Sequence, residues 1–374
     1  MKNRLLSLDI FRGITITCMI IVNTPGSGET RFDALRHAAW DGFTPTDLVF
    51  PSFVFITGLS SWFSYKAYNH VLTSDLAAKI WKRSLIIFLL GVGLYAFPFV
   101  GNPIGNWRIL GVLQRIALCY GIGSMVCLVL NKNQIIALSA ALLLGYWGIL
   151  SAFGDLTMAG NAGQKLDLWL FGDSHLYHGE GIAFDPEGLL STMPSLVTYL
   201  IGYLVGSFIG QTADKEKIIQ QLSYAGMALV VGGLLWHFGF PINKKLWTSS
   251  YVLLASGLST LIFTFCFYLI DFKRITHLTD FKRMTNWANF FKIFGTNAIL
   301  GYMVSELLVI SLELITTTDA SGKAINAKEA IYQTLFSSWM GSNEVASLAF
   351  SLAYVGVCWF IVWLFYRKNV FLKV

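Results

Sequence analysis

Long apolar runs follow one another along the whole chain, separated by short polar segments. A transmembrane helix needs about 20 consecutive apolar residues. Runs of roughly that length lie at 8–24, 47–67, 81–100, 108–130, 134–153, 189–210, 222–240, 248–270, 291–315 and 346–366. The pattern therefore predicts an all-α, polytopic membrane protein with about ten transmembrane helices in one bundle.

Positive charge is distributed unevenly over the polar segments. If the N-terminus is cytoplasmic, the Lys- and Arg-rich segments are cytoplasmic too: these are 66–83, 131–133, 211–221, 271–292 and the tail after Phe365. Both termini are then predicted on the cytoplasmic side. Lys244 and Lys245 are exceptions on the outer side, where we expect them to contact lipid headgroups.

Neither a fixed repeat nor a low-complexity linker interrupts the chain, so we predict one transmembrane domain over residues 1–374. The longest outer loop, at about 154–188, is too short for a separate domain but long enough to cap a site. The N-terminus lacks a cleavage-site pattern, and its apolar run already holds Asp9 and Arg12. It is therefore expected to be a retained helix rather than a signal peptide.

Composition and charge narrow the function. Hydrophobic residues make up 55% of the chain, charged residues 13%, and the mean hydropathy is +0.60, which excludes an ordinary soluble domain. The net charge of +6 lies in short clusters between apolar runs, so we expect a lipid bilayer and no nucleic acid as partner. The five cysteines all fall within apolar runs, which predicts neither a disulfide nor a zinc site.

Several ionisable residues interrupt the apolar runs. Each costs about 3 kcal/mol inside a membrane helix, so each is a functional candidate. Asp9, Arg12 and Asn23 share one face of the first helix, because Arg12 and Asn23 are separated by about three helical turns. For Asp9 and Arg12, an internal ion pair and a ligand contact are equally supported.

The fourth predicted helix opens with "NWRILGVLQRIALCY". A helix there would have Arg108, Gly111 and Arg115 on one face, with Gln114 beside them. Two arginines and a glycine on one face can admit a phosphate group. We interpret Arg108 as an anchor at the membrane interface, and Gln114 and Arg115 as ligand-binding residues.

Histidines are the candidate acid–base groups. His175 and His178 form an H-x-x-H pair near Asp173, but the loop offers no thiolate and no helical i, i+4 pair, so no metal site is predicted. His37 precedes the helix-capping order "TPTD" at 44–47, near the outer mouth of the bundle. Its imidazole can accept a proton from an amine or hydroxyl, or carry an acyl group. Spacing alone slightly favours a structural bond to a loop carbonyl.

Several segments, taken in order, resemble the heparan-alpha-glucosaminide N-acetyltransferase family of transmembrane acyltransferases. They are "RLLSLDIFRGITITCMIIVN", "HAAWDGFTPTDLVFPSFVFITG", "RILGVLQRIALCY", "LDLWLFGDSHLYH" with "DPEGLLSTMPS", and "PINKKLWTSSYVL". The resemblance extends from Arg4 to the closing "YRKNVFLKV" and so covers nearly the whole chain.

The resemblance implies an enzyme that takes acetyl-CoA from the cytoplasm as co-substrate. It would transfer the acetyl group to the amine of a terminal glucosamine-type sugar across the membrane. His37 matches the catalytic histidine of the family's H-x-x-W-x-G motif, and Asn23 matches an asparagine of the family's site. Gln114 and Arg115 match the family's "LQR" segment, which is associated with the cofactor site.

The chain also departs from the family pattern. We expect no counterpart of the extra N-terminal lumenal domain. The segment between Asn23 and His37 differs in length, and Ser52 stands where the family often has tryptophan. We therefore expect a compact bacterial form in the inner (plasma) membrane, with the identity of the acceptor sugar left open.

These inferences combine into an expected site. Arg12, Gln114 and Arg115 are expected to hold acetyl-CoA. His37 would be the base, Asn23 a positioning group or oxyanion donor, and Asp47 or Asp41 would orient the imidazole. The acceptor is expected to contact the following residues of the outer side: Trp40, Asp173, His175, Asp185 and Glu187, with Trp169 or Tyr177 able to stack. A structural role for the D-P-E-G turn is equally supported.

Three questions stay open from the sequence: the route of transfer, the kind of function and the oligomeric state. The transfer can be direct or pass through an acetyl-histidine. The protein can instead be an O-acetyltransferase of cell-envelope glycans, or a secondary transporter of a small polar or anionic solute, although no inverted repeat is detectable. A second copy of the chain is left open as a partner, in a homodimer.

Overall fold

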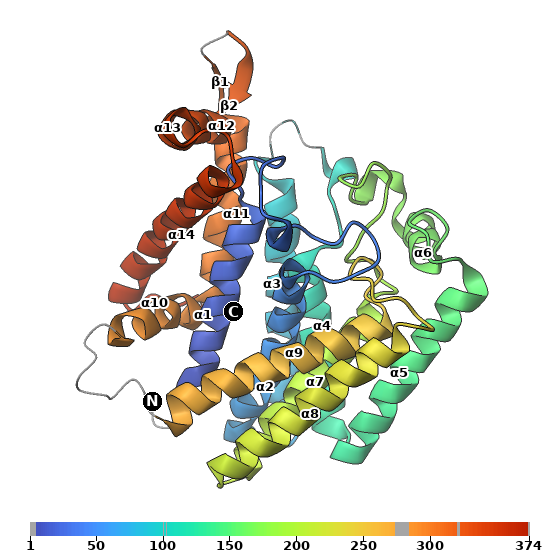
Figure 1. Ribbon diagram of the computed structural model, residues 1–374. Coiled ribbons are helices and arrows are strands. Elements are labelled where there is room, and N and C mark those ends of the chain that lie inside the picture. Colours follow the sequence, from blue (N-terminus) through green and yellow to red (C-terminus); the bar gives the residue numbers. More distant parts are fainter. Residues whose placement is uncertain (1–4, 100, 102, 274–283, 320–321, 373–374) are drawn as a thin grey trace. The chain divides into compact units, whose positions relative to one another are not determined.

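A computed structural model describes residues 5–99, 101, 103–273, 284–319 and 322–372. It confirms the predicted class, because nearly all of the regular structure is helical and the chain is a polytopic membrane protein (Figure 1). Among the described residues, eight helices are long and apolar enough to cross a membrane. One bent pair of helices makes a ninth span if it is counted as one crossing.

Two predicted spans differ from the observed helices, and the first is 81–100. This run lies in α3 (Ser74–Ala96), which begins earlier because the Thr73 hydroxyl accepts a backbone N–H of the first turn at 3.2 Å. The added turns, residues 74–80, carry the charged side chains of Asp75 and Lys79. α3 is not one of the eight helices that qualify as spans.

The second difference concerns the run at 291–315. Here the chain forms two helices, α10 (Met284–Thr296) and α11 (Ala298–Leu314), which meet at 85°. The Asn297 side chain lies at the break, donates to the carbonyl of Val370 at 3.1 Å and accepts the N–H of Leu372 at 3.0 Å. Contacts with the C-terminal segment therefore satisfy the polar side chain at the break.

Contacts between residues group the chain into two compact units. Unit 1 comprises residues 1–37, 44–49 and 266–373, and unit 2 comprises residues 38–43 and 50–265. The expectation of one transmembrane domain over 1–374 stays a prediction.

Short 3₁₀ turns lie at Asp33–Leu35, Pro45–Leu48, Lys66–Tyr68, Ile104–Asn106 and Asp173–His175, and π turns at Tyr268–Phe272 and Gln333–Ser337.

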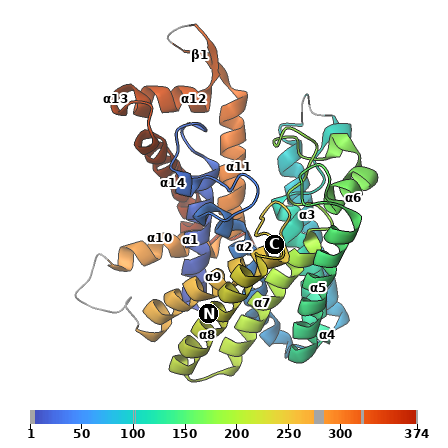
Figure 2. The ribbon, with the colours of Figure 1, turned by 45° about the vertical axis from the view of Figure 1, so that its right-hand side comes forward.

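Unit 1 is built around α1, which packs against α10, α11 and α14 (Figure 2). Glycine allows the backbones of α1 and α10 to touch: a Cβ atom on Gly13 would lie 1.9 Å from the carbonyl oxygen of Phe291, and one on Gly295 would lie 1.7 Å from that of Asp9. The remaining elements form an antiparallel hairpin and short helices. The bounds are α1 (Leu6–Asn23), β1 (Thr316–Thr318), β2 (Ala324–Asn326), α12 (Ala327–Tyr332), α13 (Ser338–Met340) and α14 (Glu344–Arg367).

Unit 2 is built around α7, which contacts α4, α5 and α8. Its Ser195 and Thr198 side chains are fully buried, as expected for a helix at the centre of a bundle. α7 also meets α2 closely, since a Cβ atom on Gly202 would lie 2.0 Å from the carbonyl oxygen of Phe55. The bounds are α2 (Val49–Tyr65), α4 (Val112–Val129), α5 (Lys132–Phe153), α6 (Ala162–Phe171), α7 (Thr192–Gln211), α8 (Lys215–Trp236) and α9 (Ser249–Phe267).

Candidate active site

His37 and Asp47 form a close pair in unit 1. The distance from His37 Nδ1 to Asp47 Oδ1 is 2.7 Å. The Asp47 side chain is 1% exposed and that of His37 is 42% exposed, so a buried carboxylate holds an accessible imidazole. When the Asp47 carboxylate is ionised it only accepts hydrogen bonds, so His37 Nδ1 then carries the proton and Nε2 is the basic nitrogen. This tautomer is the one that a general base needs.

Local sequence explains why the Asp47 carboxylate is fixed. Thr44 and Asp47 form a capping box around the Pro45–Leu48 turn, in which Asp47 Oδ2 accepts the Thr44 N–H at 3.0 Å. The Thr44 hydroxyl also donates to the carbonyl of Arg36 at 2.7 Å, which ties the residue before His37 to the cap. One oxygen of Asp47 therefore builds the turn while the other orients the imidazole.

Asn23 lies at the end of α1 in the same unit, and α1 packs against the Pro45–Leu48 turn. The Asn23 side-chain N–H donates to Glu306 Oε1 of α11 at 3.4 Å. Sequence reasoning missed Glu306, although a carboxylate inside an apolar run is itself a signal for function. Its partner lies far away in sequence, so the pairing becomes visible only in the folded chain.

Arg12 is held by protein groups. Its guanidinium pairs with the Asp9 carboxylate at 3.4 Å and donates to the carbonyl of Gly295 at 3.0 Å. Of the two interpretations of Asp9 and Arg12, the internal ion pair is therefore the one present in the structure. A contact between Arg12 and acetyl-CoA stays a prediction.

The loop that follows His37, residues 38–43, belongs to unit 2. Its contacts show which of the two candidate carboxylates, Asp41 or Asp47, binds His37. Trp40 donates from Nε1 to the carbonyl of Leu156 at 2.9 Å, and its ring lies 5.8 Å from that of Phe184. Asp41 accepts the Asn243 side-chain N–H at 3.1 Å. Asp41 therefore stabilises the loop through Asn243, whereas Asp47 is the carboxylate that contacts His37.

Lys245 also anchors this loop, so the expectation that it contacts lipid headgroups is wrong. Its ammonium group lies 2.5 Å from Glu180 Oε2 and donates to the carbonyl of Ala39 at 3.0 Å. The side chain is largely buried, which allows these two contacts to replace water.

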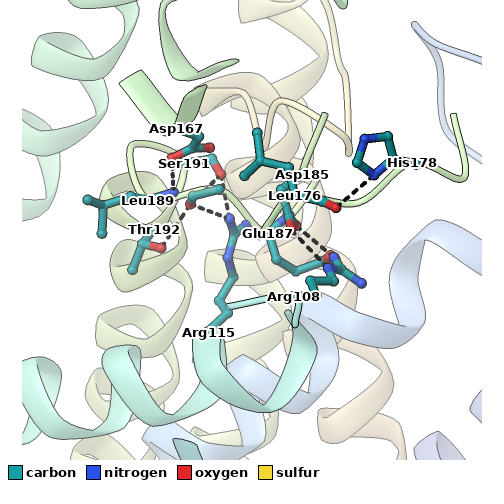
Figure 3. Close-up of polar contacts among 11 residues, drawn as sticks. Arg108, Arg115, Asp167, Leu176, His178, Asp185, Glu187, Leu189, Ser191 and Thr192 are labelled. Carbon is teal, nitrogen blue, oxygen red and sulfur yellow. Dashed lines mark hydrogen bonds and ion pairs between the residues drawn. The ribbon is translucent and has the colours of Figure 1, made fainter. Parts of the chain in front are cut away.

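Arg108 is the centre of a buried ion-pair cluster in unit 2 (Figure 3). Its guanidinium donates to both Asp185 oxygens at 2.9 and 2.7 Å and to Glu187 Oε2 at 2.7 Å. It also lies 4.7 Å from the ring centres of Tyr95 and Tyr177. Although burial opposes the charge, the phenol and the carboxylates raise the pKa of Arg108.

This cluster corrects the prediction for Arg108. The residue lies before α4, whose N-cap is Gly111, so Arg108 does not share a helical face with Arg115. It is a clamp for the D-P-E-G turn rather than an interface anchor, because only 13% of its side chain is exposed. Asp185 and Glu187, predicted to bind the acceptor, both use their carboxylates in this clamp.

Arg115 closes the same turn from the α4 side. Its guanidinium donates to the carbonyl of Gly188 at 2.8 Å and to the Ser195 hydroxyl at 3.0 Å. It also donates to the Ser191 hydroxyl (Figure 3). It also lies 5.0 Å from the Trp247 ring centre. The side chain is fully buried, and a contact between Arg115 and the cofactor stays a prediction.

Gln114 differs from its neighbour. Its amide is fully buried, and neither its oxygen nor its nitrogen has a hydrogen-bond partner among the residues that the structure describes. Gly91 of α3 makes room for it, since a Cβ atom there would lie 2.3 Å from Gln114 Oε1. Buried amides are nearly always bonded, so this side chain is suited to a ligand.

The remaining predicted acceptor residues lie in the loop at about 154–188, which is predicted to be on the outer side. Asp173 is exposed and pairs with His178 Nε2 at 3.2 Å. His175 Nδ1 lies 2.7 Å from the carbonyl oxygen of Trp107. Across the described part of the chain, no three His, Cys, Asp or Glu side chains are grouped as metal ligands.

Asp167 of α6 supports the D-P-E-G turn from a third direction. Its Oδ1 accepts the N–H of Leu189 at 3.0 Å (Figure 3). Burial, assisted by the nearby Asp185 carboxylate, raises the pKa of Asp167 to about 7, despite the bond from Leu189 and the charge of Arg115.

Comparison with known proteins decides the family. Residues 4–234 match the family model described as "Heparan-alpha-glucosaminide N-acetyltransferase, catalytic". The chain belongs to this family. The matched segment contains His37, Asp47, Arg108 and Arg115, and it ends before Glu306.

Two curated relatives of the family are named heparan-alpha-glucosaminide N-acetyltransferase. The protein from Mus musculus is 29% identical over 369 residues, which cover 82% of this chain and 54% of the relative. The protein from Homo sapiens is 28% identical over 333 residues, which cover 73% and 50%. The chain thus spans about half the length of these relatives, and it carries a membrane acetyltransferase domain of their family.

Proposed function

We propose that this protein transfers the acetyl group of acetyl-CoA to the amine of a glucosamine-type sugar on the extracytoplasmic side of the membrane. The observation that carries the proposal is the 2.7 Å contact between His37 Nδ1 and the buried Asp47 carboxylate. A base oriented in this way suits acyl transfer, and the family of the chain consists of acetyltransferases.

The chemistry follows from the tautomer. The amine nitrogen attacks the thioester carbon, and Nε2 of His37 takes a proton from that nitrogen as the new C–N bond forms. Asp47 stabilises the resulting imidazolium, which then gives the proton to the departing CoA sulfur as the C–S bond breaks. The Asn23 amide is our candidate donor to the oxyanion of the tetrahedral intermediate. A route through an acetyl-His37 intermediate would use the same His37 and Asp47 in two half-reactions.

Acetyl-CoA binding is assigned to Gln114 and Arg115, which match the family's "LQR" segment, and to Arg12 of α1. The surroundings of these three residues support the assignment unequally. Gln114 fits best, because its buried amide has unmet hydrogen-bonding capacity that the amides of a pantetheine arm can satisfy. Arg12 and Arg115 bond to protein carbonyls, hydroxyls or a carboxylate. They would have to exchange these partners for a phosphate.

The acceptor is assigned to the outer loop and the segment after His37. Trp40, Asp173 and His175 supply an indole and polar groups suited to a sugar ring. Trp169 is 80% exposed and Tyr177 is partly exposed, so both can stack on a sugar. Asp185 and Glu187 would act indirectly, by fixing the turn through Arg108.

Purified protein in detergent, incubated with labelled acetyl-CoA and glucosamine, tests the proposal. We expect N-acetylglucosamine, identified by mass shift and by resistance of the product to mild base. A base-labile ester would indicate O-acetyl transfer instead. Movement of solute across proteoliposomes without a new covalent bond would indicate a transporter.

His37→Ala should abolish the product while the protein keeps its elution profile and a cooperative thermal transition. His70→Asn is the matched control, because His70 stacks on Trp62 at 3.7 Å, has a left-handed backbone that asparagine tolerates, and is not part of the proposed site. Wild-type turnover by folded His37→Ala protein would contradict the proposed mechanism.

A further inference from the structure

Glu306 is a carboxylate within a membrane helix whose partner is a residue of the proposed site. It lies in the middle of α11, and its Oε1 accepts the side-chain N–H of Asn23 at 3.4 Å. Both residues belong to unit 1. Ionisable groups at such positions are costly, and they are retained mainly where they hold or act on something.

The helix that carries Glu306 is held in place by contacts of its own. The neighbouring Ser305 is buried, and its carbonyl accepts the Tyr354 hydroxyl of α14 at 2.6 Å. α11 packs against both α1 and α14, and its N-terminal end is held at the break by Asn297. The carboxylate is therefore presented to the end of α1 by a helix that is anchored on two sides.

The contact with Glu306 Oε1 decides how the Asn23 amide is oriented. An amide has a donor end and an acceptor end of nearly equal shape, and only the hydrogen-bond partners distinguish them. An ionised carboxylate accepts and cannot donate, so it selects the NH₂ end of Asn23. The planar NH₂ group has a second N–H. Once the first N–H points to Glu306, the direction of the second is fixed.

We propose that Glu306 is a positioning residue, which orients the Asn23 amide so that its second N–H donates to the oxyanion of the acyl-transfer reaction. The inference rests on the proposed function, and in particular on Asn23 as oxyanion donor. Glu306 acts through Asn23 and does not itself touch the reacting atoms.

The other carboxylate of α11 offers a contrast and a control. Glu313 lies near the end of the helix, is 47% exposed, and pairs with Lys328 at 3.2 Å. Such exposed pairs contribute about 0–1 kcal/mol. Glu313→Gln therefore removes a charge from the same helix without touching Asn23.

A double-mutant cycle tests the proposal, using the full chain in detergent with acetyl-CoA and glucosamine. Glu306→Gln can present either end of its own amide to Asn23 and so loses the selection. We expect kcat to fall about 10- to 100-fold, the range for a hydrogen bond to a charged group, with KM for both substrates changed less than about twofold. Glu313→Gln should keep wild-type kcat.

The cycle distinguishes positioning from a purely structural role. In an Asn23→Ala background, adding Glu306→Gln should change kcat less than about twofold, since the group that it orients is gone. Multiplicative losses in the double variant would overturn the proposal, as would wild-type kcat in Glu306→Gln. If Glu306→Gln does not fold, Glu306→Asp, which keeps the charge on a shorter arm, should show the same lack of additivity.

The outcomes also separate this inference from the proposed function. Loss of activity in Asn23→Ala together with full activity in Glu306→Gln would reject only the role of Glu306. Full activity in Asn23→Ala would reject Asn23 as oxyanion donor, and this inference with it. Absence of any acetyl transfer by the wild-type protein would reject the proposed function itself.

Discussion

The His37–Asp47 pair shows how local sequence can prepare a reactive group. A capping box normally serves only to begin a helix, and here Asp47 completes that box with Oδ2. Its Oδ1 is then already placed toward His37, ten positions earlier in the chain. The stability of the turn and the orientation of the imidazole therefore depend on the same carboxylate.

Replacement of Asp47 by asparagine tests this dual role. The oxygen of the new amide can still accept the Thr44 N–H, so the turn should form. The NH₂ group of that amide would face His37 Nδ1 and move the imidazole proton to Nε2, where it blocks the base. We expect kcat to fall about 100-fold or more, with an unchanged melting temperature. The same Asp→Asn change in a Ser-His-Asp triad lowers kcat by about 10⁴.

Asp41→Asn is the matched control, because Asp41 binds Asn243 and not His37. Equal losses of kcat in Asp47→Asn and Asp41→Asn would contradict the assignment of Asp47.

Asp167 should make stability depend on pH. Its pKa rises from 3.8 to about 7 in the folded protein, so the folded state binds the proton more tightly than the unfolded state. Its contribution to stability is complete below pH 3.8 and is lost as the pH rises through about 7. Asp167→Asn keeps an acceptor for Leu189 and should flatten the fall of melting temperature across that window.

The control for this prediction is Asp155→Asn. Bonds from Thr157 lower the pKa of the exposed Asp155, so its contribution is lost only as the pH falls below the ordinary range. Asp155→Asn should leave the slope between pH 3.8 and about 7 as in the wild type. An unchanged slope in Asp167→Asn would show that other groups are responsible.

At the scale of elements, the D-P-E-G turn before α7 depends on charges from elsewhere in unit 2. Arg108, in the segment before α4, binds the two carboxylates of the turn, and Arg115 of α4 binds its final carbonyl. Buried carboxylates without such partners would be strongly unfavourable. The junction between the outer loop and α7 is therefore held by arginines rather than by apolar packing alone.

Arg108→Met should expose this dependence. Removal of one partner from a buried ion pair costs about 3–5 kcal/mol, so we expect a clear drop in the free energy of unfolding measured by denaturation in detergent. Lys328→Met is the control, since its partner Glu313 is 47% exposed and water can replace the lost contact, so it should cost less than about 1 kcal/mol. Equal effects of the two substitutions would argue against a buried clamp.

At the scale of the whole molecule, eight candidate spans and one broken helix pair among the described residues accompany a family match over residues 4–234. Unit 1 takes its helices from both ends of the sequence, so its later half lies beyond the matched segment. Glu306 belongs to that later half.

The topology proposed for the chain can be tested by labelling. Trp169 in α6 and Lys217 at the start of α8 are separated by α7, which qualifies as a span. In a variant without native cysteines, we expect an impermeant maleimide to label Trp169→Cys in intact cells. Lys217→Cys should react only after permeabilisation, and the reverse pattern would invert the proposed orientation.

Much of the molecule follows from the sequence alone, because the relevant physics is local. Apolar runs of bilayer length define most helices, since unpaired backbone groups are not tolerated in lipid. The capping order at 44–47 predicts a turn beside His37, and the motif resemblance identifies the family. The helix over 81–100 and the start of α4 were harder to predict, because Thr73 and Gly111 set those boundaries through caps that hydropathy does not register.

Only the tertiary structure decided which polar residues meet. Arg108 was interpreted as an interface anchor and Lys245 as a headgroup contact, because a one-dimensional pattern cannot reveal distant carboxylates such as Asp185 and Glu180. The choice of Asp47 over Asp41, and the pairing of Asn23 with Glu306, likewise depend on distances across the folded chain. Hydropathy determines where a helix can lie in the bilayer, whereas the partner of a buried charge is determined by packing.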